Sequence, residues 1–365
     1  MTVPTPKPIH STPAPYGYLP APEPMPDPKQ ASEPKPKNTR SKKRRFKKKM
    51  TDLYQSVTDT VIAQLEAGCV PWVQPWARVG EMSGTKTPMG LPTNGHTSRQ
   101  YSGINILLLW GAAIDTKRTT QTWLTYKQAL ELGGNVRAGE SGTTVCYAST
   151  FTPKAEKERA ATNGLEPQSI GFLKRYTVFN ADQCEGLSDE FYKDVEPLPD
   201  CEIIPIAENL INATGADFRI GGDKAFYMPS KDLIQVPPQP AFFKQINYYR
   251  TCFHELGHWT GHTSRLDRDQ KGNKGTKLYA REELVAEMTS AFICAHLGIQ
   301  PTVRHTDYLG SWLRLLKDDK RAIFKAASQA SKSANFILEC LNTPPDEPTP
   351  QQVQAPVKRQ LEVAA

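Results

Sequence analysis

The segment YYRTCFHELGHWTGH, residues 248–262, carries the pattern from which the fold and chemistry of this chain are inferred. Its HELGH core places His254 and His258 four residues apart, with Glu255 directly after the first histidine. On a helix, residues four apart project from one face, so both imidazoles are able to bind one ion. Zinc hydrolases use this arrangement, because the ion lowers the pKa of a bound water to about 7 and the carboxylate takes its proton. The motif predicts a Zn²⁺ cofactor, with His254 and His258 as metal ligands and Glu255 as the catalytic residue.

The motif alone leaves an alternative open, in which the two histidines and the glutamate lie on a solvated helix surface. A zinc site also needs a third ligand. His262 continues the spacing of four, but it lies about 12 Å along the helix from His254 at about 1.5 Å per residue. It reaches the same ion only if the helix breaks at Gly261. A metzincin site is excluded, because the position that should hold its third histidine is Ser264.

The segment AREELVAEMTSAFICAHLG, residues 280–298, offers a better third ligand. Glu283 and Glu287 lie one helical turn apart, beside an apolar stripe. Carboxylates next to apolar surface cost free energy unless they are paired or bind a cation. We predict that Glu283 is the third metal ligand and that Glu287 orients one of the histidines. Glu282 is expected to face solvent, and a solvated pair of glutamates is the alternative.

The net charge of +7 on this 365-residue chain comes from one short segment. KNTRSKKRRFKKK, from Lys37 to Lys49, holds nine basic residues and no acidic one, so removing it leaves a net charge of −2. The folded part is therefore close to neutral. Three interpretations of the basic run stay open: an electrostatic DNA tether, a nuclear-import signal in a eukaryotic host, and a solvated linker.

Composition along the chain predicts its organisation. Proline-rich, polar segments at both ends predict a disordered arm over residues 1–50 and a disordered tail over residues 343–365. An acidic, proline-containing stretch, FYKDVEPLPD at residues 191–200, is typical of a domain boundary. We therefore expect one domain over residues 51–190 and a second over residues 200–342.

Hydrophobic spacing predicts an α+β fold class. From Asp52, apolar residues recur every four positions, and residues 104–114 form a second helical pattern. Alternating segments predict strands at residues 143–150 and 171–180. Residues 218–237 are expected to form a β-hairpin with their Gly-Gly pair in its turn, followed by a mostly helical region.

Several classes of protein are excluded by composition. No segment approaches the ~18 consecutive apolar residues of a membrane span, and the N-terminus lacks the charged and apolar regions of a secretory signal. The seven cysteines form no CxxC pair, which argues against a disulfide framework and a cysteine zinc ribbon. We expect a soluble, cytoplasmic protein with no membrane partner.

Two sets of segments resemble a known family. YYRTCFHELGHWTGHTSRLDR and YAREELVAEMTSAF resemble the zincin-type metallopeptidase domain of ArdC-family antirestriction proteins. LPTNGHTSRQYSGINILLLW, TWLTYKQALELGGNVRAGESGTTVCY and YTVFNADQCEGL are similar to the family's N-terminal single-stranded-DNA-binding domain, which also begins TraC-type conjugative primases. The resemblance spans residues 51–342. It implies a small DNA-binding domain followed by a mostly helical zincin-like domain, and its ExxA pattern supports Glu283 as the third ligand.

The resemblance also implies a function. It indicates a protein of a plasmid or other mobile element that protects incoming DNA from restriction, binds single-stranded DNA, and carries a gluzincin-like zinc peptidase site. A restriction or host factor is the expected protein substrate. The alternative is a non-enzymatic protein that masks single-stranded DNA, or a conjugative primase accessory protein, with a structural or vestigial zinc site.

Single-strand binding relies on aromatic side chains that stack on bases, together with a few cations. Residues 51–150 hold as many acidic as basic residues, so a broadly basic surface is not expected. Trp72 and Trp76 lie in the proline-containing loop VPWVQPWAR and are expected to be exposed, whereas Trp110 and Trp123 are expected in the core. The predicted DNA-binding residues are Trp72, Trp76, Arg78, Lys86, Arg99, Tyr101, Lys127 and Arg137.

Overall fold

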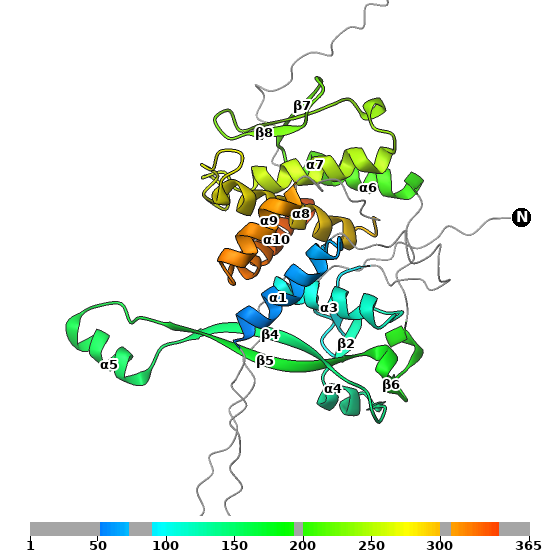
Figure 1. Cartoon of the computed structure of the whole chain (residues 1–365), viewed down its shortest axis with the longest axis vertical. Coiled ribbons are helices and arrows are strands. Elements are labelled where there is room, and N and C mark those ends of the chain that lie inside the picture. Colours follow the sequence, from blue (N-terminus) through cyan, green and yellow to red (C-terminus); the bar gives the residue numbers. More distant parts are fainter. Residues whose placement is uncertain (1–51, 73–89, 193–199, 300–307, 343–365) are drawn as a thin grey trace, which may run out of the picture. The chain divides into compact units, whose positions relative to one another are not determined.

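The computed structural model describes residues 52–72, 90–192, 200–299 and 308–342 (Figure 1). All of them belong to one compact unit that begins at Thr51. It combines helices with short sheets, so the predicted α+β class is confirmed. None of the described helices is long and apolar enough to cross a membrane. The predicted disordered arm and tail lie outside the described residues.

The first half of the described chain is built on a four-stranded sheet. Its strand order is β1-β2-β5-β4, with β1 parallel to β2 and the other neighbours antiparallel. The elements are α1 (Leu53–Glu66), β1 (Thr93–Asn94), α3 (Ile104–Asp115), β2 (Thr122–Leu124), α4 (Tyr126–Glu131), β3 (Asn135–Val136), β4 (Thr143–Phe151), α5 (Lys154–Asn163), β5 (Ile170–Asn180) and β6 (Cys184–Glu185). The helices and strands predicted in this half are therefore confirmed.

Local chemistry explains where these helices begin. The Asp52 carboxylate accepts a hydrogen bond from the Tyr54 N–H at 3.0 Å and caps the N-terminus of α1. At α4, Thr125 and Gln128 form a capping box, each side chain accepting a hydrogen bond from the other residue's backbone N–H. The sequence therefore encodes both helix starts within a few residues.

The second half is mostly helical, with one small sheet. Its elements are α6 (Asp200–Ala213), β7 (Asp217–Ile220), β8 (Phe226–Met228), β9 (Leu233–Val236), α7 (Gln245–Trp259), α8 (Lys277–His296), α9 (Leu309–Asp318) and α10 (Ala322–Glu339). The expected hairpin around the Gly-Gly pair is wrong. The strand order is β7-β9-β8, and β7 pairs in parallel with β9. The antiparallel hairpin joins β8 to β9 instead, and the two glycines lead from β7 toward β8.

One hydrophobic cluster unites residues from both halves of the chain. Trp72 packs edge-on against Trp312 with 5.3 Å between ring centroids, and Trp110 packs against Phe292 at 5.8 Å. The expectation that Trp72 is exposed is wrong, because Trp72 is fully buried in this cluster, with Trp312 of α9 packed against it. Trp110 and Trp123 are buried, as predicted. The division into domains at residues 190–200 stays a prediction.

Helices α7 and α8 approach each other closely at Gly257. A Cβ atom added to Gly257 would lie 3.0 Å from the Ala286 Cα and 3.3 Å from its Cβ. The glycine of HELGH and the alanine of EELVA are therefore the small residues that let the two backbones meet. This contact places the histidines of α7 opposite the glutamates of α8.

Replacing Gly257 with alanine should separate these helices. A mid-helix Gly→Ala change usually stabilises a helix by up to about 1 kcal/mol. Here we expect Gly257→Ala to lower the free energy of unfolding by about 1–3 kcal/mol, because the added methyl group overpacks the contact. Gly310→Ala in α9 is the matched control, since its added Cβ meets no atom within 4 Å. Denaturant titration of both variants measures the difference, and equal stabilities would contradict the close-contact argument.

Candidate metal centre

Two helices bring three potential metal ligands together. His254 and His258 project from α7, and Glu283 projects from α8. The Nε2 atom of His254 lies 3.5 Å from Glu283 Oε2, and the Nε2 atom of His258 lies 3.6 Å from Glu283 Oε1. One ligand atom from each residue lies within 4.8 Å of the other two. Among the described residues, the structure thus groups the three predicted ligands and leaves His262 outside.

This donor set fits a divalent cation. Three protein ligands at about 2.0–2.2 Å from one ion lie within about 4 Å of each other, close to the separations seen here. Burial raises the pKa of Glu283, but His254 and His258 outweigh it and lower the pKa to about 2. A charged carboxylate and two imidazole nitrogens therefore face one point in a buried site.

Glu255 lies beside the ligands and is almost fully buried, with 6% of its surface exposed. Burial raises its pKa and outweighs the neighbouring His254 and His258, which act in the opposite direction. A raised pKa brings a carboxylate closer to the pH at which it is able both to accept and to return a proton. Its position and environment suit a general base.

Each histidine faces a further carboxylate with its Nδ1 atom. Glu282 Oε1 lies 3.3 Å from Nδ1 of His258, and Glu287 Oε1 lies 3.7 Å from Nδ1 of His254. In metal sites, a carboxylate at the far nitrogen fixes the ring orientation and makes the imidazole a more basic ligand. Glu287 lies beside one of the histidines, His254, as the sequence analysis predicts. Glu282 has the same position beside His258, which the sequence analysis did not predict.

The expectation that Glu282 faces solvent is wrong. Helix α8 is enclosed by α7, α9 and α10, and the residues from Glu282 to Ala295 are all buried, so this part of the helix has no solvated face. Glu282 accepts hydrogen bonds from Arg268 at 2.7 and 3.1 Å and from Gln270 at 3.0 Å. Burial alone raises the pKa of Glu282, but His258 and Arg268 lower it to about 2.

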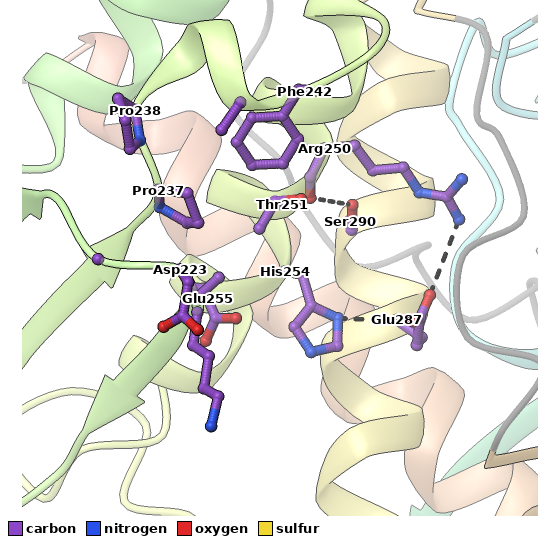
Figure 2. Close-up of a pocket in the computed structure, with 14 residues that line it drawn as sticks. Asp223, Pro237, Pro238, Phe242, Arg250, Thr251, His254, Glu255, Glu287 and Ser290 are labelled. Atoms are coloured by element: carbon purple, nitrogen blue, oxygen red, sulfur yellow. Dashed lines mark hydrogen bonds and ion pairs between the residues drawn. The ribbon is translucent and has the colours of Figure 1, made fainter.

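A buried arginine lies behind each of these carboxylates. Arg268 also donates to the backbone oxygen of Gly257 and to the hydroxyls of Thr260 and Ser333. Arg250, with 4% of its side chain exposed, places Nη2 3.8 Å from Glu287 Oε2 (Figure 2). The site therefore contains two His–Glu–Arg rows. Neither arginine was predicted from the sequence. The TSRLDR segment, which directly follows the motif and ends with Arg268, was a possible signal for one of them.

A cavity of about 660 Å³ opens beside His254 and Glu255. Figure 2 shows Pro237, Pro238 and Phe242 on the opposite side from His254. Pro237, Pro238 and Phe242 give apolar lining, whereas Asp223, Lys224 and side chains of α7 and α8 give polar lining. The candidate catalytic groups are thus reached through a cavity lined by both apolar and charged side chains.

The predicted DNA-binding residues meet different environments. Trp72 is buried, and Trp76, Arg78 and Lys86 lie outside the described residues. Tyr101 packs against the core and accepts a hydrogen bond from Asn94 at 3.4 Å. Three cations remain at least partly exposed. They are Arg99, Lys127, which pairs with Glu131, and Arg137, which pairs with Glu140. Asn94 donates to the Tyr101 hydroxyl and to the Gln128 side chain, so the segments that carry Tyr101 and Lys127 lie next to each other.

Comparison with known proteins places this architecture in a family. Residues 51–179 match the N-terminal domain of anti-restriction factor ArdC, and residues 205–329 match the zincin-like metallopeptidase family MPTase-PolyVal. The metal-free crystal structure of the antirestriction protein ArdC from plasmid R388 matches with a TM-score of 0.66 and 41% identity, over 80% of this chain and 98% of that one. This chain belongs to the ArdC family. The resemblance seen in the sequence is confirmed.

Other relatives of this ArdC-family protein agree with the assignment. The Mn(II)-bound structure of ArdC from R388 matches with a TM-score of 0.63, and a zincin-like domain indicates a divalent-metal site. The uncharacterized protein y4eC of Sinorhizobium fredii is 38% identical over 79% of this chain and 92% of its own length. Two TraC DNA primases of Escherichia coli are 38% and 37% identical, but this chain spans only 29% and 20% of their length.

Removing the cation behind Glu282 should destabilise the protein strongly. Arg268→Met leaves a buried carboxylate without its guanidinium partner, and we expect the free energy of unfolding of the metal-free protein to fall by about 3–5 kcal/mol. Arg219→Met is the matched control, because Arg219 pairs with Asp217 on the surface, where water and salt screen the attraction and its loss should change stability little. Chemical denaturation measures both. Similar losses for the two variants would show that Arg268 is not needed to hold the buried charge.

Proposed function

We propose that this chain is an antirestriction-type protein of a mobile element, which acts in the cytoplasm, binds single-stranded DNA and hydrolyses peptide bonds at a zinc site. The observation that carries the peptidase part is the convergence of His254 Nε2, His258 Nε2 and the Glu283 carboxylate beside the buried Glu255. Membership of the ArdC family and the zincin-like match support it. A restriction or host factor is the proposed protein substrate.

The proposed chemistry assigns a separate task to each residue. His254, His258 and Glu283 would hold the metal, which when bound supplies Lewis-acid polarisation and a water of lowered pKa. Glu255 accepts the proton of the attacking water and returns it to the leaving amine. Glu282 and Glu287 keep the two imidazole rings turned with Nε2 toward Glu283.

The cavity beside Glu255 provides room for a substrate segment. Its apolar wall, formed by Pro237, Pro238 and Phe242, offers contact area for an apolar side chain. Arg250, Thr251 and Ser290 line the same cavity from α7 and α8. This combination supports a polypeptide substrate, because a peptide presents both apolar side chains and backbone polar groups.

Glu255→Gln separates hydrolysis from DNA masking. Because the variant keeps the shape of the side chain, we expect unchanged zinc content and thermal stability, whereas peptidase turnover should fall about 10²- to 10⁴-fold. Protection of unmodified plasmid DNA in a restricting host should be lost. Glu166→Gln, at an exposed position, is the control and should protect like the unmodified chain. Full protection by Glu255→Gln would favour the non-enzymatic alternative.

Metal titration tests the zinc assignment. We expect one zinc ion per chain to bind more tightly than Mn²⁺, because two imidazoles and one carboxylate suit zinc. Glu287→Gln should weaken zinc binding about 10- to 100-fold by releasing the His254 ring, and Glu283→Gln should weaken it more. Competition against a chelator, read by elemental analysis, measures both variants. Tighter binding of Mn²⁺ than of zinc by the unmodified chain would overturn the choice of metal.

A further inference from the structure

Strands β4 and β5 form a long two-stranded ribbon that runs out to α5 (Figure 1). Directly paired residues share a face of a sheet, and so do residues two apart along each strand. The register pairs Tyr147 with Lys174 and Phe151 with Ile170. One side of the ribbon therefore carries the following residues, here called the ribbon face: Tyr147, Ser149, Phe151, Ile170, Phe172, Lys174 and Tyr176.

The ribbon face is rich in exposed aromatic surface. Phe151 is 50% exposed and Tyr176 is 37% exposed. The rings contact each other in sequence, with centroid distances of 6.0 Å for Phe151–Phe172, 6.3 Å for Phe172–Tyr147 and 6.1 Å for Tyr147–Tyr176. A row of adjacent rings with this much exposed surface marks an interaction site rather than scattered surface residues.

The base of the ribbon is anchored. The Asn105 side chain of α3 donates to the Cys146 backbone oxygen and accepts from its N–H, both at 2.8 Å. Val145 and Cys146 are buried, whereas the residues from Tyr147 to Phe151 are half-buried or exposed. The aromatic rings are thus presented by a β-structure whose start is fixed to the folded core.

The charge of the ribbon suits an anionic partner. Lys174 places its Nζ 5.0 Å from the centroid of the Phe172 ring, while Arg175, the next residue of β5, lies on the opposite face of the ribbon. Strands β4 and β5 contain no carboxylate side chain. Residues 143–180, including α5, carry five basic and three acidic side chains, a net charge of +2. Stacked rings with an interleaved cation are the combination with which proteins bind single strands, whose bases are free to stack.

We propose that the ribbon face is a stacking platform for single-stranded DNA. This inference rests on the proposed DNA binding and adds the position of the bound DNA strand. The aromatic residues of the ribbon face take the stacking role predicted for Trp72 and Tyr101, because Trp72 is buried and Tyr101 packs against the core. Bases stack on the Phe172 and Tyr176 rings, while Lys174 contacts the phosphate backbone.

Fluorescence anisotropy of the full chain with labelled oligo(dT) tests this assignment. Phe172→Ala and Tyr176→Ala should each weaken binding about 5- to 150-fold while leaving the salt dependence of the binding constant unchanged. Lys174→Ala should instead reduce the slope of log K against log[salt] by up to about one. Phe243→Ala is the control, because this fully exposed aromatic residue lies outside the ribbon, and it should bind like the unmodified chain.

The outcomes separate this inference from the proposed function. If the unmodified chain does not bind oligo(dT), the proposed DNA binding fails, and the platform fails with it. If the unmodified chain binds but the Phe172 and Tyr176 variants bind equally well, only the location on the ribbon face is overturned. If those variants instead turn a dimer into a monomer in light scattering and still bind DNA normally, the face is an interface between copies and the inference is again overturned.

Discussion

The contact between α7 and α8 at Gly257 and Ala286 is the constraint on which the candidate site depends. Two helices that meet with only a hydrogen atom and a methyl group between them are close enough for side chains one turn away to share an ion. His258 follows Gly257 directly, and Glu283 lies one turn before Ala286. Larger residues at the contact would move Glu283 away from the imidazoles. The small residues within HELGH and EELVA therefore have a geometric role alongside the ligands.

Placing acidic side chains at a buried helix contact creates an electrostatic problem that the surrounding residues solve. Glu282 and Glu287 are buried away from solvent that would stabilise their charge, and each carboxylate lies beside an arginine as well as a histidine. The resulting rows, His258–Glu282–Arg268 and His254–Glu287–Arg250, hold both imidazoles with Nε2 toward Glu283. A buried carboxylate that is paired with an arginine and a histidine holds those side chains in one arrangement. A preorganised metal site requires ligands that are fixed in this way.

Local periodicity made part of this site predictable, whereas tertiary packing decided the rest. His254, Glu255 and His258 were grouped because spacing of four on one helix is a property of the sequence alone, and Glu283 followed from its apolar neighbours and the family pattern. The expectations for Glu282 and Trp72 were wrong because other elements bury them: Arg268 and Gln270 bind Glu282, and Trp312 of α9 packs on Trp72. The β7–β9 pairing was missed because parallel strands are joined by a crossover connection and not by a tight hairpin turn, so no turn signal marks the pair in the sequence.

Helix α10 links the two regions to which function is assigned. Its Ser331 hydroxyl accepts a hydrogen bond from the Gly103 N–H at the start of α3, and its Ser333 hydroxyl accepts one from Arg268 at the metal centre. Helix α3 in turn holds the base of the β4–β5 ribbon through Asn105. Short hydrogen bonds between rigid elements therefore run from the ribbon to the His258–Glu282–Arg268 row. Such a connection sets the position of one region relative to the other.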